Sequence, residues 1–417
     1  MRVLHLADLH LDSPMRGLSA HQDAPDAIAS CTRDAFQNAV GFAVDEAVDL
    51  VLIAGDAYDG EWNDFSTGVF LARQLGRLRD ARIPVVMVWG NHDRASLITD
   101  RLSLPDGVRV LALDRPETVV FEQLGVAVHG QSFGAREVPE DLAAAYPPAR
   151  PDLVNIGLLH TSFAGGVGHD TYAPTSAAVL QRAGYDYWAL GHVHMRSQVS
   201  RSPVAWYAGC VQGRSVKETG AHGGLLVRLE RGEAPVVEEH DFDVLRFVAV
   251  TVDCAGESSI NGVITRCRAK FAEAVGEADG RSVAARVTLE GATAAHRLLL
   301  AREDELVAGL QLAASDVGQD RLWLGRVSVE TVEVQTQSAG DSELAGVLDA
   351  ALADPRTKDE LAGVLAELVE LLPDAMLDAG ASLSWLADSD TAWGRLAEKG
   401  RARLEDALGL LDGTDGG

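Results

Sequence analysis

Residues 187–194 read YWALGHVH, an apolar run that ends in a glycine and two histidines. Consecutive large apolar residues predict a buried β-strand over 187–190. Gly191 permits a tight turn after that strand. His192 and His194 are two residues apart, so both imidazoles can lean to one side of the turn. This stretch therefore predicts a strand that delivers two chemically active side chains to the edge of a sheet.

The same arrangement occurs four more times in the first 160 residues. Strands are predicted at 2–7, 50–54, 85–89 and 154–159, with helical patterns between several of them. Polar residues follow each strand in turn: Asp8 and His10, then Gly55, Asp56 and Asp59, then Gly90, Asn91, His92 and Asp93, and finally His160. Apolar strands with intervening helices favour an α/β sandwich. Open α/β sheets place their active sites beyond the carboxyl ends of the strands.

The chain divides into three predicted parts. Residues 1–240 form the sandwich, to which the runs near 204–207 and 224–229 add further strands. Residues 245–336 alternate β-α-β-α-β, which indicates a small α+β domain with one helix at 294–312. Residues 340–411 are acidic, and their leucines and valines recur at helical spacing, which predicts a C-terminal helical segment.

Composition narrows the class of protein. The 417 residues include 36 Lys and Arg against 62 Asp and Glu, a net charge of −26. Such a chain repels phosphate at long range, so its composition does not indicate a basic nucleic-acid-binding surface. The four cysteines fit no zinc spacing. No apolar stretch of about 18 residues and no signal peptide is visible, which predicts a cytoplasmic protein with no membrane partner.

The polar clusters have the chemistry of a metal site. Carboxylate and amide oxygens mixed with imidazoles suit manganese, iron or zinc, and the lack of cysteine ligands argues against a structural zinc. A single histidine after a strand is usually structural. Five clusters in sequence order, each directly after an apolar strand, predict a shared metal centre.

In this order the five clusters resemble the calcineurin-like metallophosphoesterases. That family uses Asp-x-His, Gly-Asp-x-x-Asp, Gly-Asn-His-Asp, a lone His and Gly-His-x-His, all of which are present here. The segments 8–14, 187–194 and 207–220 are similar to bacterial DNA repair exonucleases of the SbcD and YhaO type, relatives of the nuclease subunit of double-strand-break repair complexes. Relatives usually have Pro-Gly-Asn where this chain has Ala208-Gly209-Cys210. The resemblance covers about residues 1–230.

The resemblance implies a four-layer metallophosphoesterase β-sandwich flanked by helices, then a small α+β capping domain and a C-terminal helical segment. It also implies two divalent metal ions, with manganese expected, bridged by Asp56. The remaining ligands would be Asp8, His10 and His194 for one ion, and Asn91, His160 and His192 for the other. His92 would be the catalytic residue beside the scissile phosphate, oriented by Asp93, while Asp59 would either support the site or stabilise a turn.

Two enzyme functions are compatible with these features. The first is a two-metal-dependent DNA exonuclease or endonuclease acting in DNA repair with an SMC-like coiled-coil ATPase, which the C-terminal helices would dock; a homodimer is left open. The second is a metallophosphoesterase for small substrates, a cyclic-nucleotide phosphodiesterase or a nucleotide hydrolase, which the acidic net charge favours. A third reading, a non-catalytic scaffold, is disfavoured by the intact ligands.

If DNA is the substrate, we expect it to contact a basic rim and a loop that lines the cleft. The rim would consist of Arg196, Arg201, Arg214 and Lys217, and the loop would span residues 162–172.

Overall fold

A computed structural model describes most of the chain. The described residues are 1–15, 28, 30–59, 65–95, 102–163, 172–319, 321–334, 346–347, 350–351, 354, 356–357, 360, 363–364, 390–408 and 411. Contacts divide the chain into two units. The first is Met1–Ala249 with Val275–Arg286, and the second is Val250–Ala274 with Val287–Gly417.

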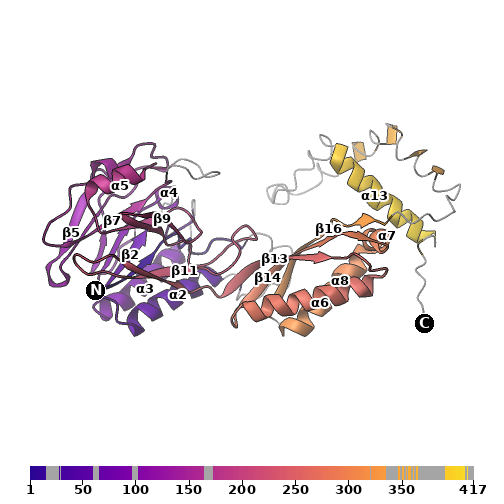
Figure 1. Ribbon diagram of the computed structural model, residues 1–417, viewed down its shortest axis with the longest axis horizontal. Helices are drawn as coiled ribbons and strands as arrows, with labels where there is room; N and C mark the ends of the chain where they lie inside the picture. The colour runs from indigo at the N-terminus through magenta and orange to yellow at the C-terminus, as the bar shows by residue number, and fades with distance from the viewer. Residues whose placement is uncertain are drawn as a thin grey trace. The chain divides into compact units, whose positions relative to one another are not determined.

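The first unit is built on two six-stranded sheets (Figure 1). The strands of the first sheet, in spatial order, are β12 (Val236–Asp241), β11 (Gly223–Arg228), β1 (Arg2–Leu6), β2 (Leu50–Ala54), β3 (Val85–Val88) and β4 (Val108–Val110). Those of the second sheet are β5 (Glu117–Phe121), β6 (Val126–Gly130), β7 (Val154–His160), β8 (Tyr187–Gly191), β10 (Val204–Tyr207) and β9 (Ser197–Arg201).

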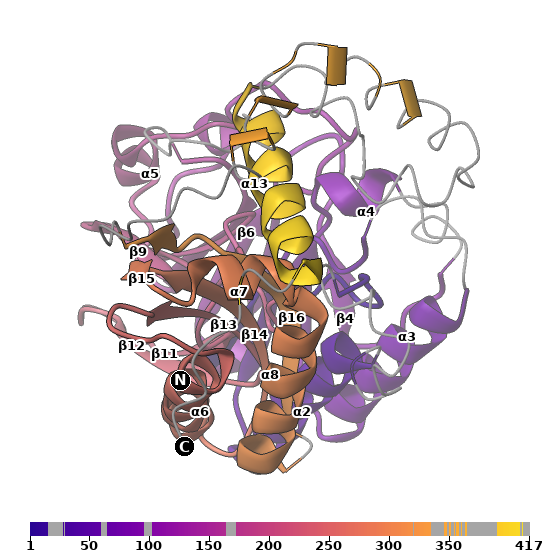
Figure 2. The same cartoon turned by 90° about the vertical axis from the view of Figure 1, so that its right-hand side faces the viewer.

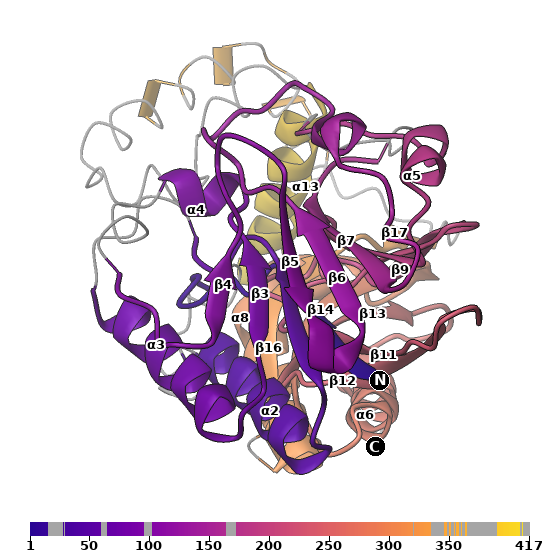
Figure 3. The same cartoon turned by 90° about the vertical axis from the view of Figure 1, so that its left-hand side faces the viewer.

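Helices cover the outer faces of both sheets. Along the first sheet run α2 (Cys31–Asp45) and α3 (Phe65–Asp80) (Figure 3). The second sheet is covered by α5 (Ala177–Ala183) and the 3-10 turn η2 (Leu142–Ala145). The remaining short helices are α4 (Asn91–Ala95) and the 3-10 turn η1 (Glu122–Leu124). Two sheets flanked by helices confirm the predicted α/β sandwich.

Strand alternation explains the layering. Leu4 and Leu6 of β1 pack with the apolar faces of α2 and α3, whereas Val3 packs with residues of both sheets. Successive side chains of a strand point to opposite faces. A strand buried on both faces must therefore be apolar throughout, which is why the sequence shows continuous apolar runs.

Parallel pairing brings the ends of the strands to one edge. β1, β2 and β3 are parallel neighbours in the first sheet, as are β6, β7 and β8 in the second. The two sheets approach closely at this edge. A Cβ on Gly191 would overlap the carbonyl oxygen of Ala54 in the opposite sheet, and one on Gly55, whose φ is +94°, would overlap the ring of His160. Glycine is required at both positions, because larger residues would separate the polar clusters.

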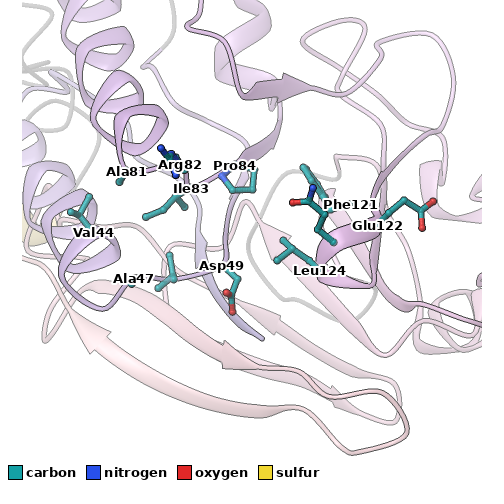
Figure 4. A pocket seen from close by; sticks show the side chains of 12 residues that line it. Val44, Ala47, Asp49, Ala81, Arg82, Ile83, Pro84, Phe121, Glu122 and Leu124 are labelled. Carbon is teal, nitrogen blue, oxygen red and sulfur yellow. The ribbon is translucent and has the colours of Figure 1, made fainter.

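A pocket of about 630 Å³ lies at the other end of the same strands (Figure 4). Asp49 and Pro84, which directly precede β2 and β3, line it together with Phe121 and Leu124. Because the polar clusters follow the carboxyl ends of these strands, this pocket is separate from them.

The elements after residue 244 follow the predicted β-α-β-α-β order. A three-stranded sheet has the order β13 (Leu245–Asp253), β14 (Ser282–Glu290), β16 (Leu322–Val329), and the connecting helices are α6 (Ile260–Glu277), α7 (His296–Ala301) and α8 (Glu303–Gly318). The short strands β15 (Ala292–Thr293) and β17 (Val332–Glu333) pair in parallel. The expected single helix at 294–312 is two helices, since Arg302 leaves the helical region with φ −109° and ψ 45°. Three acidic residues then begin α8, which suits a helix N-terminus.

The last described helix, α13 (Asp390–Ala407), packs against α7 within the second unit (Figure 2). Ion pairs carry much of this contact, including Arg297 with Glu405 and Arg302 with Asp406. Most of the rest of the predicted helical segment 340–411 lies outside the described residues. Among the residues that the structure describes, none of the helices is both long enough and apolar enough to cross a membrane.

Candidate metal centre

The polar clusters that the sequence places far apart meet at the carboxyl edge of the two sheets. Among the described residues, four groups bring their possible ligand atoms within 4.8 Å of one another. Two consist of predicted ligands, namely Asp8 with His10 and His194, and Asp8 with Asp56 and His160, and the other two are His10 with Asp59 and His92, and His194 with Cys210 and Glu218. The other two predicted ligands are adjacent: Asn91 Oδ1 is 2.9 Å from His160 Nε2, and the His192 ring centroid is 5.2 Å from that of His160.

Asp56 occupies the centre of this arrangement. Its Oδ2 lies 3.9 Å from His10 Nε2 and 3.4 Å from His160 Nε2. Its Oδ1 accepts a hydrogen bond from the backbone N–H of His92 at 3.0 Å. One oxygen of Asp56 therefore faces both histidine groups, which is the position that a bridging carboxylate between two cations requires.

The backbone is strained at these ligands. Asp8, His10, Asp56 and His192 have φ values of 49°, 40°, 52° and 106°, in a region that residues other than glycine rarely adopt. Each such conformation costs about 1–3 kcal/mol and persists only where the surroundings enforce it. Here hydrogen bonds between the strand ends enforce it. The Asp8 N–H donates to Gly55 O, and the His192 N–H donates to both carboxylate oxygens of Asp8.

The charges at the centre are buried. Asp8, His10, Asp56 and His160 are at most 1% exposed. Burial disfavours an imidazolium at His160, but the carboxylate of Asp56 outweighs it and raises the pKa of His160 to about 9. Burial, with Arg214 second, lowers the pKa of His10 to about 3. Without a metal, the positive charge of His160 offsets part of the charge of the two buried carboxylates. The donor set of oxygens and imidazoles fits divalent metal ions, which would take over that role.

His92 lies beside the ligands, and its partner is Asp59. The His92 side chain is 37% exposed, and its Nδ1 is 3.1 Å from Asp59 Oδ1. This hydrogen bond is the main cause that raises the pKa of His92. Asp93, expected from the sequence to orient His92, accepts hydrogen bonds from the backbone N–H groups of Gly90 and Tyr58. Burial raises the pKa of the Asp93 carboxyl to about 7.

Two of the four residues of the expected basic rim, Arg196 and Arg214, are paired with carboxylates. Arg196 is 9% exposed and pairs with Asp241 at 2.6 Å and with Glu239 at 3.3 Å. Arg214 is 15% exposed and contacts Asp59 and Glu218. Asp241 and Asp59 are far from these arginines in the sequence, and Glu218 has no distinctive sequence context, so the sequence does not indicate these ion pairs. Arg201 and Lys217 are exposed. Most of the expected cleft loop, with His169, lies outside the described residues.

Cys210, which replaces the usual asparagine, belongs to a structural hydrogen-bond chain. Its Sγ is 3.3 Å from His222 Nδ1, and His222 Nε2 is 3.1 Å from the carbonyl oxygen of Glu218. Burial raises the pKa of the thiol well above its usual value, so the S–H is retained and donates to His222. The S–H group of Cys210 thus holds the ring of His222, and His222 holds the backbone of the loop that carries Glu218.

Comparisons with known proteins match this geometry. A model of the calcineurin-like phosphoesterases matches residues 1–196, and a model of the middle domain of metallophosphoesterase YhaO matches residues 247–332. The uncharacterized metallophosphoesterase YhaO of Bacillus subtilis is 33% identical over 341 residues, which are 79% of this chain and 82% of that protein. The DNA double-strand break repair protein Mre11 of Methanopyrus kandleri is 26% identical over 289 residues, 62% of this chain and 60% of that protein.

Solved structures include TT1561 of Thermus thermophilus, with 11% identity and a TM-score of 0.34, and a dimetal phosphatase from Danio rerio, with 13% identity and a TM-score of 0.33. Each covers 57% of this chain and 98% of its own.

The fold and the ligand constellation thus define a phosphoester hydrolase with a dinuclear metal site. The chain belongs to the calcineurin-like phosphoesterases and, within them, to the YhaO family.

Proposed function

We propose that this protein is a two-metal-dependent DNA exonuclease or endonuclease that acts in DNA repair. The observation that carries the phosphodiesterase chemistry is the position of Asp56 Oδ2 between His10 and His160, with the half-exposed His92 alongside. DNA as substrate is supported by the similarity to the Mre11 protein of Methanopyrus kandleri, which spans 62% of this chain.

The ligands would hold two divalent cations, for which we propose manganese. Asp8, His10 and His194 would complete one site, Asn91, His160 and His192 the other, and Asp56 would belong to both. Bound there, the cations would neutralise the charge of the phosphate. They would also lower the pKa of a bound water molecule, so that hydroxide forms near neutral pH.

His92 would act on the leaving oxygen. Its Nδ1 faces the Asp59 carboxylate, so that an N–H there is donated to Asp59 and Nε2 is left for the substrate. The raised pKa of His92 favours the protonated ring. A positioned imidazolium can give its proton to the departing oxygen as the bond to phosphorus breaks. Asp59 stabilises that imidazolium and fixes its direction.

A small phosphodiester is the second candidate substrate. Arg196 and Arg214, two of the four basic side chains of the expected rim, are already paired with carboxylates. A cyclic-nucleotide phosphodiesterase or a nucleotide hydrolase needs no extended track of cations, whereas DNA is usually held through its phosphates.

One comparison of substrates separates the two candidates. The metal-free protein is supplied with Mn²⁺ or Mg²⁺ and assayed on linear DNA, nicked DNA, a cyclic nucleotide and bis-p-nitrophenyl phosphate. The proposal predicts manganese-dependent cleavage of DNA and of the chromogenic ester. Cleavage of the small substrates with intact DNA would replace it by the second candidate.

We further propose an SMC-like coiled-coil ATPase as the partner that supplies most of the DNA affinity, because the chain is acidic overall. Weak DNA binding by the isolated chain that falls steeply with salt is expected. Tight binding that salt does not weaken would contradict the need for this partner.

A further inference from the structure

His194 is held between a hydrogen-bond acceptor and a hydrogen-bond donor. Its Nδ1 lies 2.7 Å from Glu218 Oε1 and 3.2 Å from a terminal nitrogen of Arg214. On the other side of the ring, Nε2 lies 3.2 Å from Nε2 of His10. Nε2 is therefore the atom that faces the metal centre, and Nδ1 is the atom that faces the Glu218 loop.

The two neighbours of Nδ1 favour opposite tautomers. A neutral imidazole carries one N–H, and only the bare nitrogen can bind a metal. When Nδ1 carries the hydrogen and donates to Glu218, Nε2 is bare. When Nδ1 accepts a hydrogen bond from Arg214, the hydrogen moves to Nε2 and blocks metal binding. Glu218 is closer by 0.5 Å, and as an anion it is the stronger partner.

Glu218 is held by Arg214 as well as by His194. Its Oε2 accepts the backbone N–H of Arg214 at 2.7 Å, and the Arg214 guanidinium lies 3.4 Å from Oε1.

The loop that carries Glu218 is itself braced. Cys210 and His222 support the Glu218 carbonyl oxygen, and a Cβ on Gly213 would come within 2.7 Å of that oxygen. The Arg214 guanidinium is held in turn by Ser13 Oγ at 3.2 Å and by Asp59 at 3.7 Å. The carboxylate and the guanidinium therefore compete for His194 from fixed positions.

We propose that Glu218 is a positioning residue that selects the metal-binding tautomer of His194, against Arg214, which favours the other one. The inference rests on His194 as a metal ligand and on no particular substrate. Removal of Glu218 then does more than delete a hydrogen bond, because Arg214 is left alone with Nδ1 and holds the ring in the form that cannot bind metal.

A double-mutant cycle of metal binding tests this competition. Binding of Mn²⁺ to the metal-free protein is measured by calorimetry, without substrate, for wild type, Glu218→Ala, Arg214→Met and the double variant. Outer partners of metal-bound histidines contribute about 10–100-fold in affinity, so Glu218→Ala is expected to weaken one of the two ions by that factor. The double variant should bind that ion more tightly than Glu218→Ala does. Equal or weaker binding by the double variant would overturn the proposal.

Glu398→Ala is the matched control, because it removes a carboxylate 3.1 Å from the ring of His296, in the second unit. Its Mn²⁺ affinity should equal that of wild type, and a loss there would show that carboxylate removal weakens binding without acting on His194.

A spectrum of the wild-type protein covers the case in which Glu218→Ala fails to fold. In a long-range ¹H–¹⁵N spectrum of the metal-free protein, the signal that disappears in His194→Gln should have the Nδ1–H pattern. An Nε2–H pattern would overturn the proposal. Because no substrate is present in either experiment, failure to cleave DNA would count only against the proposed function.

Discussion

Two histidine–carboxylate pairs, one in each unit, differ in the group that the second ring nitrogen of the histidine faces. In the second unit, both ring nitrogens of His296 have protein partners, Thr331 Oγ1 at 2.8 Å and Glu398 Oε1 at 3.1 Å. In the first unit, the carboxylate of Glu218 lies 2.7 Å from His194 Nδ1, and His194 Nε2 faces His10. Both histidines have a neighbouring carboxylate. What separates the proposed metal ligand His194 from the structural His296 is therefore the partner of the second ring nitrogen.

The surroundings of the two pairs differ as well. Glu218 is 17% exposed and Glu398 is 57% exposed. Around His194 lie further buried imidazoles and carboxylates on strained backbone, whereas the contacts near His296 with α13 are ion pairs of partly exposed arginines, one of them with the buried Glu405. Exposed pairs contribute little to stability, since water screens them. Substitutions in the first region should therefore change metal binding and catalysis, and those in the second should change neither.

The largest effect is expected for Asp56→Ala. Asp56 Oδ2 faces both histidine groups, so its loss should reduce the metal content from two ions toward none, while Asn91→Ala should weaken mainly one. Elemental analysis of the purified variants measures this. Unchanged metal content in Asp56→Ala would exclude a bridging role and remove the basis of the comparison.

His92→Asn should separate chemistry from metal binding. His92 contacts Asp59 and is half-exposed, so the variant should keep both ions and lose about 10²–10⁴-fold in turnover, the usual contribution of a positioned acid or base. Hydrolysis of bis-p-nitrophenyl phosphate at saturating Mn²⁺ gives the rate. Loss of metal as large as that in His192→Ala would identify His92 as a ligand.

Asp59→Asn should have a smaller effect on the same step. The amide keeps the volume and an acceptor for His92 Nδ1, but it does not stabilise an imidazolium, so turnover should fall about 10–100-fold with metal content unchanged. Asp93→Asn is the variant to compare with Asp59→Asn. Asp93 accepts a hydrogen bond from the backbone N–H of Gly90, which directly precedes Asn91. A purely kinetic defect in Asp93→Asn, with wild-type turnover in Asp59→Asn, would return the orienting role to Asp93.

The smallest effect is expected for Glu398→Ala. Its pair with His296 is largely exposed on the Glu398 side, so the free energy of unfolding should change by about 0–1 kcal/mol, with unaltered turnover. Urea unfolding monitored by circular dichroism measures the first quantity. A change in turnover would mean that this region also serves catalysis and would break the comparison.

The gathering of these polar side chains at one edge of the sheets could be predicted because its signal is local. Each ligand lies within four residues of the end of an apolar strand, and parallel neighbours bring those ends together. The metal-binding class of protein followed from this order, and the α/β sandwich followed from the apolar strands.

The partners of the ligands could not be predicted in the same way. Asp59 and His92 are 33 positions apart, and Glu218 and His194 are 24 apart, with the pairing decided by loop geometry at the sheet edge. The ion pair of Arg196 with Asp241 could not be predicted, because Asp241 lies 45 positions further on, at the end of β12 in the first sheet, whereas Arg196 precedes β9 of the second sheet. Likewise, the interruption at Arg302 has no glycine or proline to mark it.

The measurement that tests the account most directly is anomalous diffraction from crystals grown with Mn²⁺. The account predicts two manganese peaks about 3.5–4 Å apart, with Asp56 Oδ2 between them and His194 bound through Nε2 while its Nδ1 donates to Glu218. A single peak, or two peaks that do not share Asp56, would contradict it.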